Sequence, residues 1–177
     1  MNKIIAVIGM CGAGKSEAVK IFLTRGYQKV YFGDVVMEEL KKEELDANEI
    51  NERMMREKLR NEFGMGAMAV KSLDKISEFY EKGNVVIESL YSWEEYKIIK
   101  KEFPDSFKLL TIFTTKQIRY KRLSRRQVRP LSITEAYSRD ISEIEKLDKG
   151  GPIAFTDYLV MNDSSLAELE KNVLKYI

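Results

Sequence analysis

The sequence predicts an α/β fold in which a parallel sheet carries helices on both faces. Short apolar segments alternate five times along the chain with segments whose apolar residues recur at helical spacing. Such alternation is typical of strand–helix–strand units, whose strands run parallel. A glycine-rich segment directly follows the first apolar run, where a sheet of this kind joins a strand to a helix. The chain has no Pro-, Gly- or Ser-rich linker, so we expect a single domain over residues 1–177.

Five segments have the composition of buried strands. The first is an uninterrupted, mostly β-branched run, as a strand covered on both faces requires. The later ones are short and rich in Val, Ile, Leu, Phe and Tyr, and most of them are flanked by turn residues. The expected strands are, in chain order, residues 3–8, 28–33, 84–90, 107–115 and 157–162.

Helices are expected where apolar residues fall three or four positions apart. Gly26 is a candidate C-cap for the first helix, Pro104 follows the fifth, and Ser164 or Ser165 is a suitable N-cap for the last. Gly150 and the glycine after it are expected to form a turn. The third helix is expected to bury Ile50, Met54, Leu59 and Phe63. The expected helices span residues 15–26, 35–44, 50–63, 70–80, 92–103 and 133–146, and a last one begins at residue 164 or 165.

Composition limits the function classes. Of the 177 residues 44% are hydrophobic and 33% charged, and the net charge of +2 is too small to indicate nucleic acid or membrane. The chain has no histidine, which excludes Ser-His triads, histidine bases and histidine-ligated metals. Cys11 is the only cysteine, so no internal disulfide forms and a reducing cytoplasmic location is expected. The longest apolar run is too short to span a membrane.

The segment GMCGAGKS at residues 9–16 is the strongest chemical signal. It matches the P-loop pattern, in which glycines let backbone N–H groups converge on phosphate and the next helix presents its positive end. Lys15 would add a charge at the β- and γ-phosphates, and Ser16 a hydroxyl for Mg²⁺. The alternative is a glycine-rich turn that binds nothing. Nucleotide contacts are predicted at Gly9, Gly12, Ala13, Gly14, Lys15, Ser16 and Glu17.

A second signal is the basic stretch at residues 116–130, which has seven cations and no acid. Planar guanidinium groups stabilise the charge that spreads over a phosphoryl group during its transfer. The stretch is therefore predicted to be a lid that closes over the phosphates. It could instead be a solvated helix face or a nucleic-acid patch, although Tyr120 is its only aromatic residue and offers little for base stacking.

The chain resembles nucleoside monophosphate kinases and dephospho-CoA kinases in three motifs. These are the P-loop, the Gly33-Asp34 pair after the second strand, and R-x-x-R-L-x-x-R at residues 119–126. It is more similar still to a small, mostly archaeal group described as adenylate-kinase-like or dephospho-CoA-kinase-like. That similarity covers roughly the whole chain and is carried by LRNEFGMGAMAV at 59–70, SRDISEIE at 138–145 and TDYLVMND at 156–163.

The resemblance implies the three-layer fold of P-loop NTPases, with a five-stranded parallel sheet in order 2-3-1-4-5. It also implies a short mobile lid over about residues 122–140. Adenine is expected near Arg119 or Arg122, and Arg139 is expected to reach in from the second lid helix. The lid arginines expected over the phosphates are Arg122, Arg126 and Arg129.

The chain departs from these kinases on the acceptor side. They commonly hold an acceptor phosphate with one arginine after the second strand and one after the third, but here Met37 and Tyr91 stand in those places. Asp34 remains, and it is similar to the carboxylate that dephospho-CoA kinases place near the attacking hydroxyl. It is predicted to orient a hydroxyl acceptor, or else to cap the helix that begins at Val35.

Two further groups have open interpretations. Glu88 ends a central strand, where α/β sheets keep their ligands, and is predicted to hold a Mg²⁺-bound water or else to pair with a nearby Lys or Arg. Arg53, Arg56 or Arg60 could replace the missing acceptor arginines. Tyr91, Trp93 and Tyr96 are candidates to line an acceptor pocket or to be core residues.

The sequence therefore predicts an ATP- and Mg²⁺-dependent P-loop kinase that acts on a nucleotide or nucleotide-like small molecule. The predicted catalytic residues are Lys15, Asp34, Arg122, Arg126 and Arg139, and Ser16 and Glu88 are predicted to hold Mg²⁺. ATP is favoured over GTP because no guanine-reading N/TKxD-type segment is present. The alternative is an NTPase or nucleotide switch without a small-molecule acceptor. No membrane or nucleic-acid partner is expected, and oligomeric state is left open.

Overall fold

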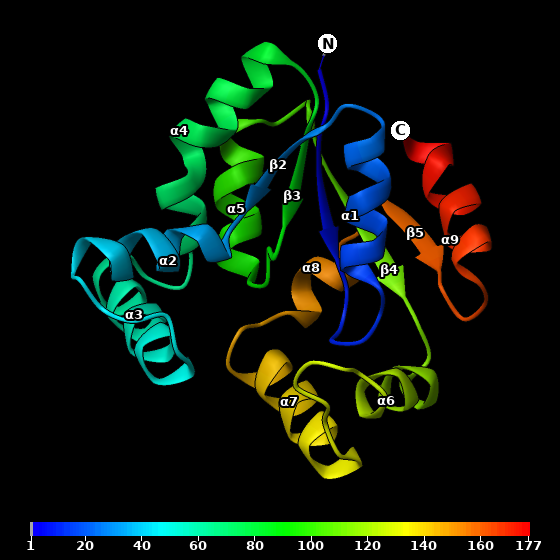
Figure 1. The fold of residues 1–177 in the computed structure, drawn as a ribbon. Helices are drawn as coiled ribbons and strands as arrows, with labels where there is room; N and C mark the ends of the chain where they lie inside the picture. Colours follow the sequence, from blue (N-terminus) through cyan, green and yellow to red (C-terminus); the bar gives the residue numbers. More distant parts are fainter. Residues whose placement is uncertain (1) are drawn as a thin grey trace.

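The computed structural model describes residues 2–177 and contains one sheet of five parallel strands (Figure 1). The strand order is β2-β3-β1-β4-β5, which confirms the predicted order 2-3-1-4-5. The strands are β1 (Ile4–Ile8), β2 (Gln28–Tyr31), β3 (Val85–Glu88), β4 (Phe107–Phe113) and β5 (Tyr158–Met161). Their carboxyl ends lie at one edge of the sheet, where the connecting loops gather.

Helices connect the strands and fill the outer layers. They are α1 (Lys15–Thr24), α2 (Gly33–Lys42), α3 (Glu49–Phe63), α4 (Ala67–Lys82), α5 (Trp93–Glu102), α6 (Lys116–Ser124), α7 (Ile133–Glu145), α8 (Gly150–Ala154) and α9 (Leu166–Val173), followed by a short 3₁₀ helix, η1 (Leu174–Tyr176). Ser92, Ser132 and Ser165 each cap a helix by accepting a backbone N–H with the side chain.

Two apolar clusters make the molecule three-layered. On one face of the sheet, Ile5 and Val7 of β1 pack with Phe22 of α1 and Leu169 of α9. On the other face, alternate strand residues such as Ile4 pack with side chains from α2, α3, α4 and α5. This alternation of sides along β1 follows from the two-residue period of a strand, so both faces of the central strand are covered.

The functional end of the molecule is built by two helical pairs beyond the carboxyl ends of the strands. Figure 1 shows α6 and α7 below the sheet and the α2–α3 pair at its side. A third, smaller apolar cluster of Cys11, Tyr120, Leu123 and Ala136 joins the glycine-rich loop to α6 and α7. The loop after β1 therefore packs against the predicted lid.

Three local predictions were wrong. Helix α2 begins at Gly33 rather than Val35, so Asp34 lies in its first turn and makes no capping hydrogen bond. In α3 the buried residues are Met55 and Leu59, whereas Ile50 is 80% exposed. Gly150 and Gly151 do not form a simple turn but begin the short helix α8.

No helix among residues 2–177 has the length and apolar character needed to cross a bilayer.

We expect Gly9→Ala to lower the free energy of unfolding by about 3 kcal/mol or more. Gly9 has a φ of 141°, and a Cβ there would collide with the backbone oxygen of Ile112. Gly26→Ala is the control, because Gly26 also has a positive φ, 82°, but nothing lies near its missing Cβ. It should cost about 1–2 kcal/mol, the strain of a left-handed alanine alone. Equal losses in urea unfolding would contradict the role of this close contact.

Candidate functional site

The loop between β1 and α1 has the backbone shape of an anion cradle. Gly9, Gly12 and Gly14 all have positive φ angles, of 141°, 81° and 99°. At Gly14 a side chain would also collide with the amide of Asn162. The loop can therefore bend and approach its neighbours closely only because glycine stands at these positions.

Side chains from outside the loop donate hydrogen bonds to two of its backbone carbonyl oxygens. Arg119 donates from Nη1 to the Cys11 oxygen at 2.9 Å. The Ala13 oxygen accepts the Thr114 hydroxyl at 3.0 Å and the Asn162 side-chain amide at 2.8 Å. In a trans peptide the N–H points opposite to the carbonyl, so this bracing turns the N–H groups of Gly12 and Gly14 away from their supports, as phosphate binding requires.

Lys15 follows the loop as the first residue of α1. Its Nζ donates to the Met10 carbonyl at 3.1 Å, so the side chain folds back over the loop. Burial is the main cause that lowers the pKa of Lys15 to about 7; the nearby Lys149 lowers it further, while the Glu143 carboxylate opposes the shift. An anionic ligand beside Lys15 would favour its charged form.

Around Lys15 lies a charged cluster that the sequence interpretation only partly found. Lys149, 1% exposed, donates to Glu143 Oε2 at 2.7 Å, and its ammonium lies 4.3 Å from the centre of the Tyr91 ring. Arg139 donates to Glu143 Oε1 at 3.4 Å. The predicted Arg139 thus reaches this cluster, whereas Glu143 and Lys149 were missed. The i,i+4 spacing of Arg139 and Glu143 could have indicated that pair, but no local pattern indicates the buried lysine.

Ser16 and Glu88, predicted to hold Mg²⁺, are brought together. The Ser16 hydroxyl donates to Glu88 Oε1 at 2.9 Å, across the ends of β1 and β3. Lys29 lies 3.5 Å from the other Glu88 oxygen, so the carboxylate also makes the predicted ion pair. The described residues contain no group of three or more Cys, Asp or Glu side chains suited to a metal. A hydroxyl and one carboxylate nevertheless fit Mg²⁺, which takes oxygen ligands and completes its shell with phosphate oxygens and water.

Arg119 joins α6 to α7 and to the P-loop. It is 6% exposed, and its guanidinium makes paired hydrogen bonds of 2.9 and 2.6 Å to the Asp140 carboxylate. The Tyr120 hydroxyl donates to the same carboxylate at 3.1 Å. The polar edge of Arg119 is thus taken by Asp140 and the Cys11 carbonyl. The predicted adenine contact would use the face of the guanidinium and stays a prediction.

The other lid arginines are spread out. Arg122 is half-buried and donates to the Thr114 hydroxyl at 3.4 Å, close behind the loop. Arg126 is exposed, in the segment between α6 and α7. Arg129 pairs with Glu49 of α3 at 3.3 Å, so the lid segment and α3 meet there. The structure therefore places Arg139 near Lys15 but does not gather Arg126 and Arg129 there.

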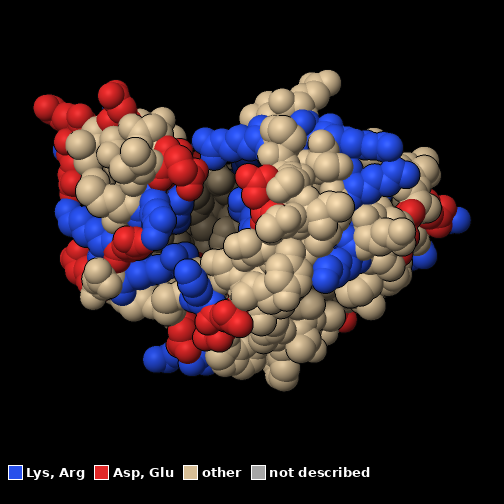
Figure 2. Space-filling model, turned by 90° about the horizontal axis from the view of Figure 1, so that it is seen from below, with Lys and Arg blue, Asp and Glu red and all other residues tan. Residues whose placement is uncertain are grey.

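A cavity of about 1000 Å³ lies between α3 and α7. Figure 2 shows a hollow whose rim carries both basic and acidic side chains. Met37 and Tyr91, at the positions of the missing arginines, both line the cavity. Helix α3 contributes Glu49, Glu52, Arg53, Arg56, Glu57 and Arg60, and α7 contributes Glu135, Ser138, Arg139, Ser142 and Glu143. The three candidate arginines of α3 therefore do face a space large enough for a nucleotide.

Asp34 is not among the side chains that line this cavity. Its carboxylate pairs with Lys75 of α4 at 3.4 Å, and its side chain is 45% exposed. The helix-cap prediction for Asp34 is wrong, whereas the orientation of a hydroxyl acceptor by this carboxylate stays a prediction.

Glu95, at the start of α5, is a buried acid on the cavity wall. It is 2% exposed, and its Oε2 accepts the backbone N–H groups of Tyr91 and Ser92 at 2.6 and 2.9 Å. Burial is the main cause that raises the pKa of Glu95 to about 7, despite these hydrogen bonds. Its charge therefore changes near neutral pH.

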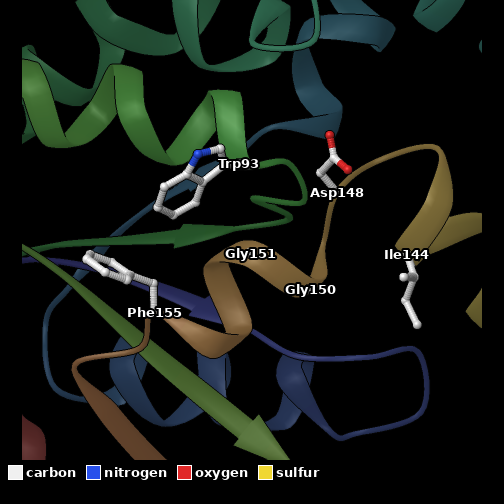
Figure 3. A pocket seen from close by; sticks show the side chains of 6 residues that line it. All are labelled: Trp93, Ile144, Asp148, Gly150, Gly151 and Phe155. Carbon is white, nitrogen blue, oxygen red and sulfur yellow. The ribbon is translucent and has the colours of Figure 1, made fainter.

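No single pocket is lined by all three candidate aromatic residues, Tyr91, Trp93 and Tyr96. A second, open pocket of about 490 Å³ is lined by Trp93, Ile144, Asp148, Gly150, Gly151 and Phe155. Figure 3 shows Trp93 and Phe155 on one side and Asp148 and Ile144 on the other, with α8 between them. Tyr96 is buried and stacks on Trp93 with ring centres 4.8 Å apart. Only Tyr91 of the three lines the large cavity.

Comparison with known proteins identifies relatives along the whole chain. Residues 8–138 match a family described as an AAA domain. A protein described as "UPF0200 protein" from the archaeon Thermococcus onnurineus is 34% identical over 178 residues, covering 98% of this chain and 96% of the relative.

Solved structures with low sequence identity share the fold. TT1252 from Thermus thermophilus has a TM-score of 0.70 at 17% identity, over 99% of this chain and 96% of that one. A shikimate kinase from Bacteroides thetaiotaomicron has a TM-score of 0.63 at 15% identity, over 99% and 97%. A dephospho-CoA kinase from Campylobacter jejuni has a TM-score of 0.56 at 18% identity, over 98% and 95%. The chain thus has a P-loop kinase-like fold.

We expect Asp140→Asn to lower the free energy of unfolding by about 3–5 kcal/mol, because it leaves the buried Arg119 cation without its counter-charge. Glu78→Gln is the control, since it breaks an ion pair with Lys82 whose side chains are 60% and 59% exposed. That change should leave the free energy of unfolding nearly unchanged, because an exposed ion pair contributes little. Urea unfolding measures both, and a small loss for Asp140→Asn would contradict the bracing role.

We expect Glu95→Gln to become stabilising relative to the natural chain as pH rises. A folded-state pKa of about 7, above the unfolded value of 4.5, means that this group's contribution to stability is complete below pH 4.5 and is lost as pH rises through 7. Glutamine has no charge to bury, so the difference between variant and natural chain should shift by roughly 3 kcal/mol between pH 4.5 and 8. The measurement is urea unfolding across this range.

Glu94→Gln is the control for this pH series, since Glu94 pairs with Lys97 and its side chain is 46% exposed. Its stability relative to the natural chain should stay nearly constant. A Glu95→Gln difference that also stays constant would contradict the raised pKa.

Proposed function

Since this chain belongs to the AAA domain family and to the UPF0200 proteins, we propose that it is a P-loop phosphotransferase. It moves the γ-phosphoryl group of ATP, with Mg²⁺, to a nucleotide or nucleotide-like small molecule. The kinase names among proteins of similar fold are consistent with this reaction class but concern those proteins only.

The observation that carries the proposal is the meeting of Ser16 and Glu88 beside Lys15. A hydroxyl and a carboxylate 2.9 Å apart lie at the carboxyl edge of the sheet, directly after a loop with the shape of an anion cradle. In open α/β sheets this edge is where ligands bind. A glycine-rich turn without a ligand would not need an acid from a second strand at the same point.

Each residue of the site has a distinct part in this proposal. The loop N–H groups and Lys15 hold the β- and γ-phosphates, and Arg139 approaches the same charge from α7. Ser16 and Glu88 hold Mg²⁺, which when bound would neutralise charge on the phosphate oxygens. As the acceptor oxygen forms its bond to phosphorus, the bond to the β-phosphate oxygen breaks, and the cations stabilise the charge that spreads between them.

The acceptor binds in the cavity between α3 and α7. Glu143, Arg139 and Tyr91 line the cavity and also belong to the charged cluster around Lys15. The acceptor space and the phosphate cradle therefore adjoin, as direct transfer requires. We propose no acceptor contact for Asp34, and we propose Arg119 as a support of the P-loop rather than an adenine contact.

The test is ADP release from Mg-ATP with a panel of nucleoside monophosphates and dephospho-CoA. One acceptor should raise turnover well above the rate without acceptor, and Lys15→Ala and Glu88→Gln should each lower that turnover at least about 100-fold. Lys20→Ala is the control, because Lys20 is on the same helix but pairs only with the exposed Glu17. It should leave turnover nearly unchanged.

Lys15-dependent ATP hydrolysis that no acceptor accelerates would contradict the kinase and favour an NTPase or switch. Absence of Lys15-dependent Mg-ATP binding in calorimetry would contradict both.

A further inference from the structure

The cavity wall formed by α3 carries three arginines, and two of them are already paired. Arg53 donates to Glu57 at 3.0 Å, and these two side chains are 74% and 60% exposed. Arg56 lies 3.4 Å from Glu52 and 3.5 Å from Glu49. Both charges are thus balanced by acids of the same helix, so neither is free to attract a ligand strongly.

Arg60 differs from both. Within residues 2–177 no acid lies within ion-pair distance of its guanidinium, and its Nε is shielded from solvent without a hydrogen-bond partner. Burial lowers the pKa of Arg60, which shows that its charge is poorly solvated. Leaving a buried charged donor without a partner costs about 1–3 kcal/mol or more, so such a group is normally satisfied by something.

The acid with the largest electrostatic effect on Arg60, Glu95, does not satisfy it. Glu95 lies close enough to affect Arg60 electrostatically, but its Oε2 accepts two backbone N–H groups at the start of α5. Burial also raises the pKa of Glu95 to about 7, so near neutral pH it is only partly ionised. Arg60 therefore presents uncompensated positive charge to the cavity that both residues line.

We propose that Arg60 binds an anionic group of the acceptor, a phosphate monoester or a carboxylate, against the α3 wall of the cavity. A guanidinium presents its N–H donors in one plane, and its two Nη groups can bind two oxygens of such a group. The bound anion would balance the charge of Arg60, which no acid among residues 2–177 pairs with. The identification of this ligand as the acceptor rests on the proposed function, but the anion contact itself can be tested without turnover.

This anion site is separate from the phosphate cradle. The charged groups that act on Lys15 come from α7, the P-loop and Lys149, whereas those that act on Arg60 come from α3 and α5. An acceptor bound between them would have its anion on α3 and its reacting oxygen toward Lys15. The structure thus favours an acceptor with an anionic group distinct from the atom that receives the phosphoryl group, or with several phosphate oxygens.

The test uses the full chain saturated with Mg²⁺ and a non-hydrolysable ATP analogue, so that added anions cannot occupy the P-loop. Inorganic phosphate and acetate are titrated in separate arms while the ¹H–¹⁵N signals of arginine Nε are recorded by NMR. The Arg60 signal, assigned by its absence in Arg60→Lys, should move and saturate with at least one anion. Stronger binding of phosphate would identify a phosphate monoester, and stronger binding of acetate a carboxylate.

Affinity is then compared among variants by calorimetry. Arg60→Met should weaken binding of the preferred anion about tenfold or more, and Arg60→Lys, which keeps the charge but loses the fork, by a smaller factor. Lys58→Met is the control on the same helix, because Lys58 pairs with Glu43 and does not line the cavity, and it should change the affinity less than twofold. If Arg60→Met does not fold, the comparison of Arg60→Lys with Lys58→Arg decides the question in the same way.

Two failures are distinguishable. An Arg60 signal that does not respond to either anion, or unchanged anion affinity in the Arg60 variants while the ATP analogue still binds, would overturn this inference alone. Loss of Lys15-dependent nucleotide binding would overturn the proposed function instead.

Discussion

The buried contact among Arg119, Asp140 and the Cys11 carbonyl is the constraint on which the rest of the site depends. A single guanidinium joins the two lid helices to each other and to the backbone of the glycine-rich loop. Rotating the whole predicted lid, residues 122–140, away from the loop would break this pair and expose the small apolar cluster around Leu123. Any motion of the predicted lid that keeps this contact would therefore be confined to the segment between α6 and α7.

Charged side chains around Lys15 set the electrostatics of the site. Lys15, Lys149 and Arg139 surround one carboxylate, Glu143, so the cluster holds more positive than negative charge. Repulsion from the neighbouring cations and burial both disfavour the charged form of Lys15. The negative charge of a polyphosphate would offset both effects. The protein therefore keeps poorly solvated positive charge where the ligand is expected. The ion pair with Glu143 holds Lys149 close to Lys15. This arrangement sacrifices stability for a cradle already formed before the ligand arrives.

Local pattern predicted the alternation of strands and helices and the phosphate loop, whereas the strand order 2-3-1-4-5 was predicted from the resemblance to P-loop kinases. Apolar runs, helical spacing and the positions of glycines are read within a few residues, and the meeting of Ser16 with Glu88 follows from parallel strands that end at one edge. The sequence could not predict contacts that depend on how α6, α7 and α8 pack. No local pattern indicated that Arg119 pairs with Asp140 on α7 or that Asp34 pairs with Lys75 on α4.

The proposed donor and acceptor sites are built from different parts of the chain. The proposed donor site is made largely of backbone, fixed by Gly9 and Gly14. The proposed acceptor site is made of side chains from α3 and α7, which a shared fold does not specify. On the α3 wall, Arg53 and Arg56 pair with acids of the same helix. We therefore expect specificity to depend on the cation that has no such partner, Arg60. If the proposed function holds, acceptor choice is accordingly decided by the shape of the α3–α7 cavity and by the unpaired Arg60, rather than by the glycine-rich loop.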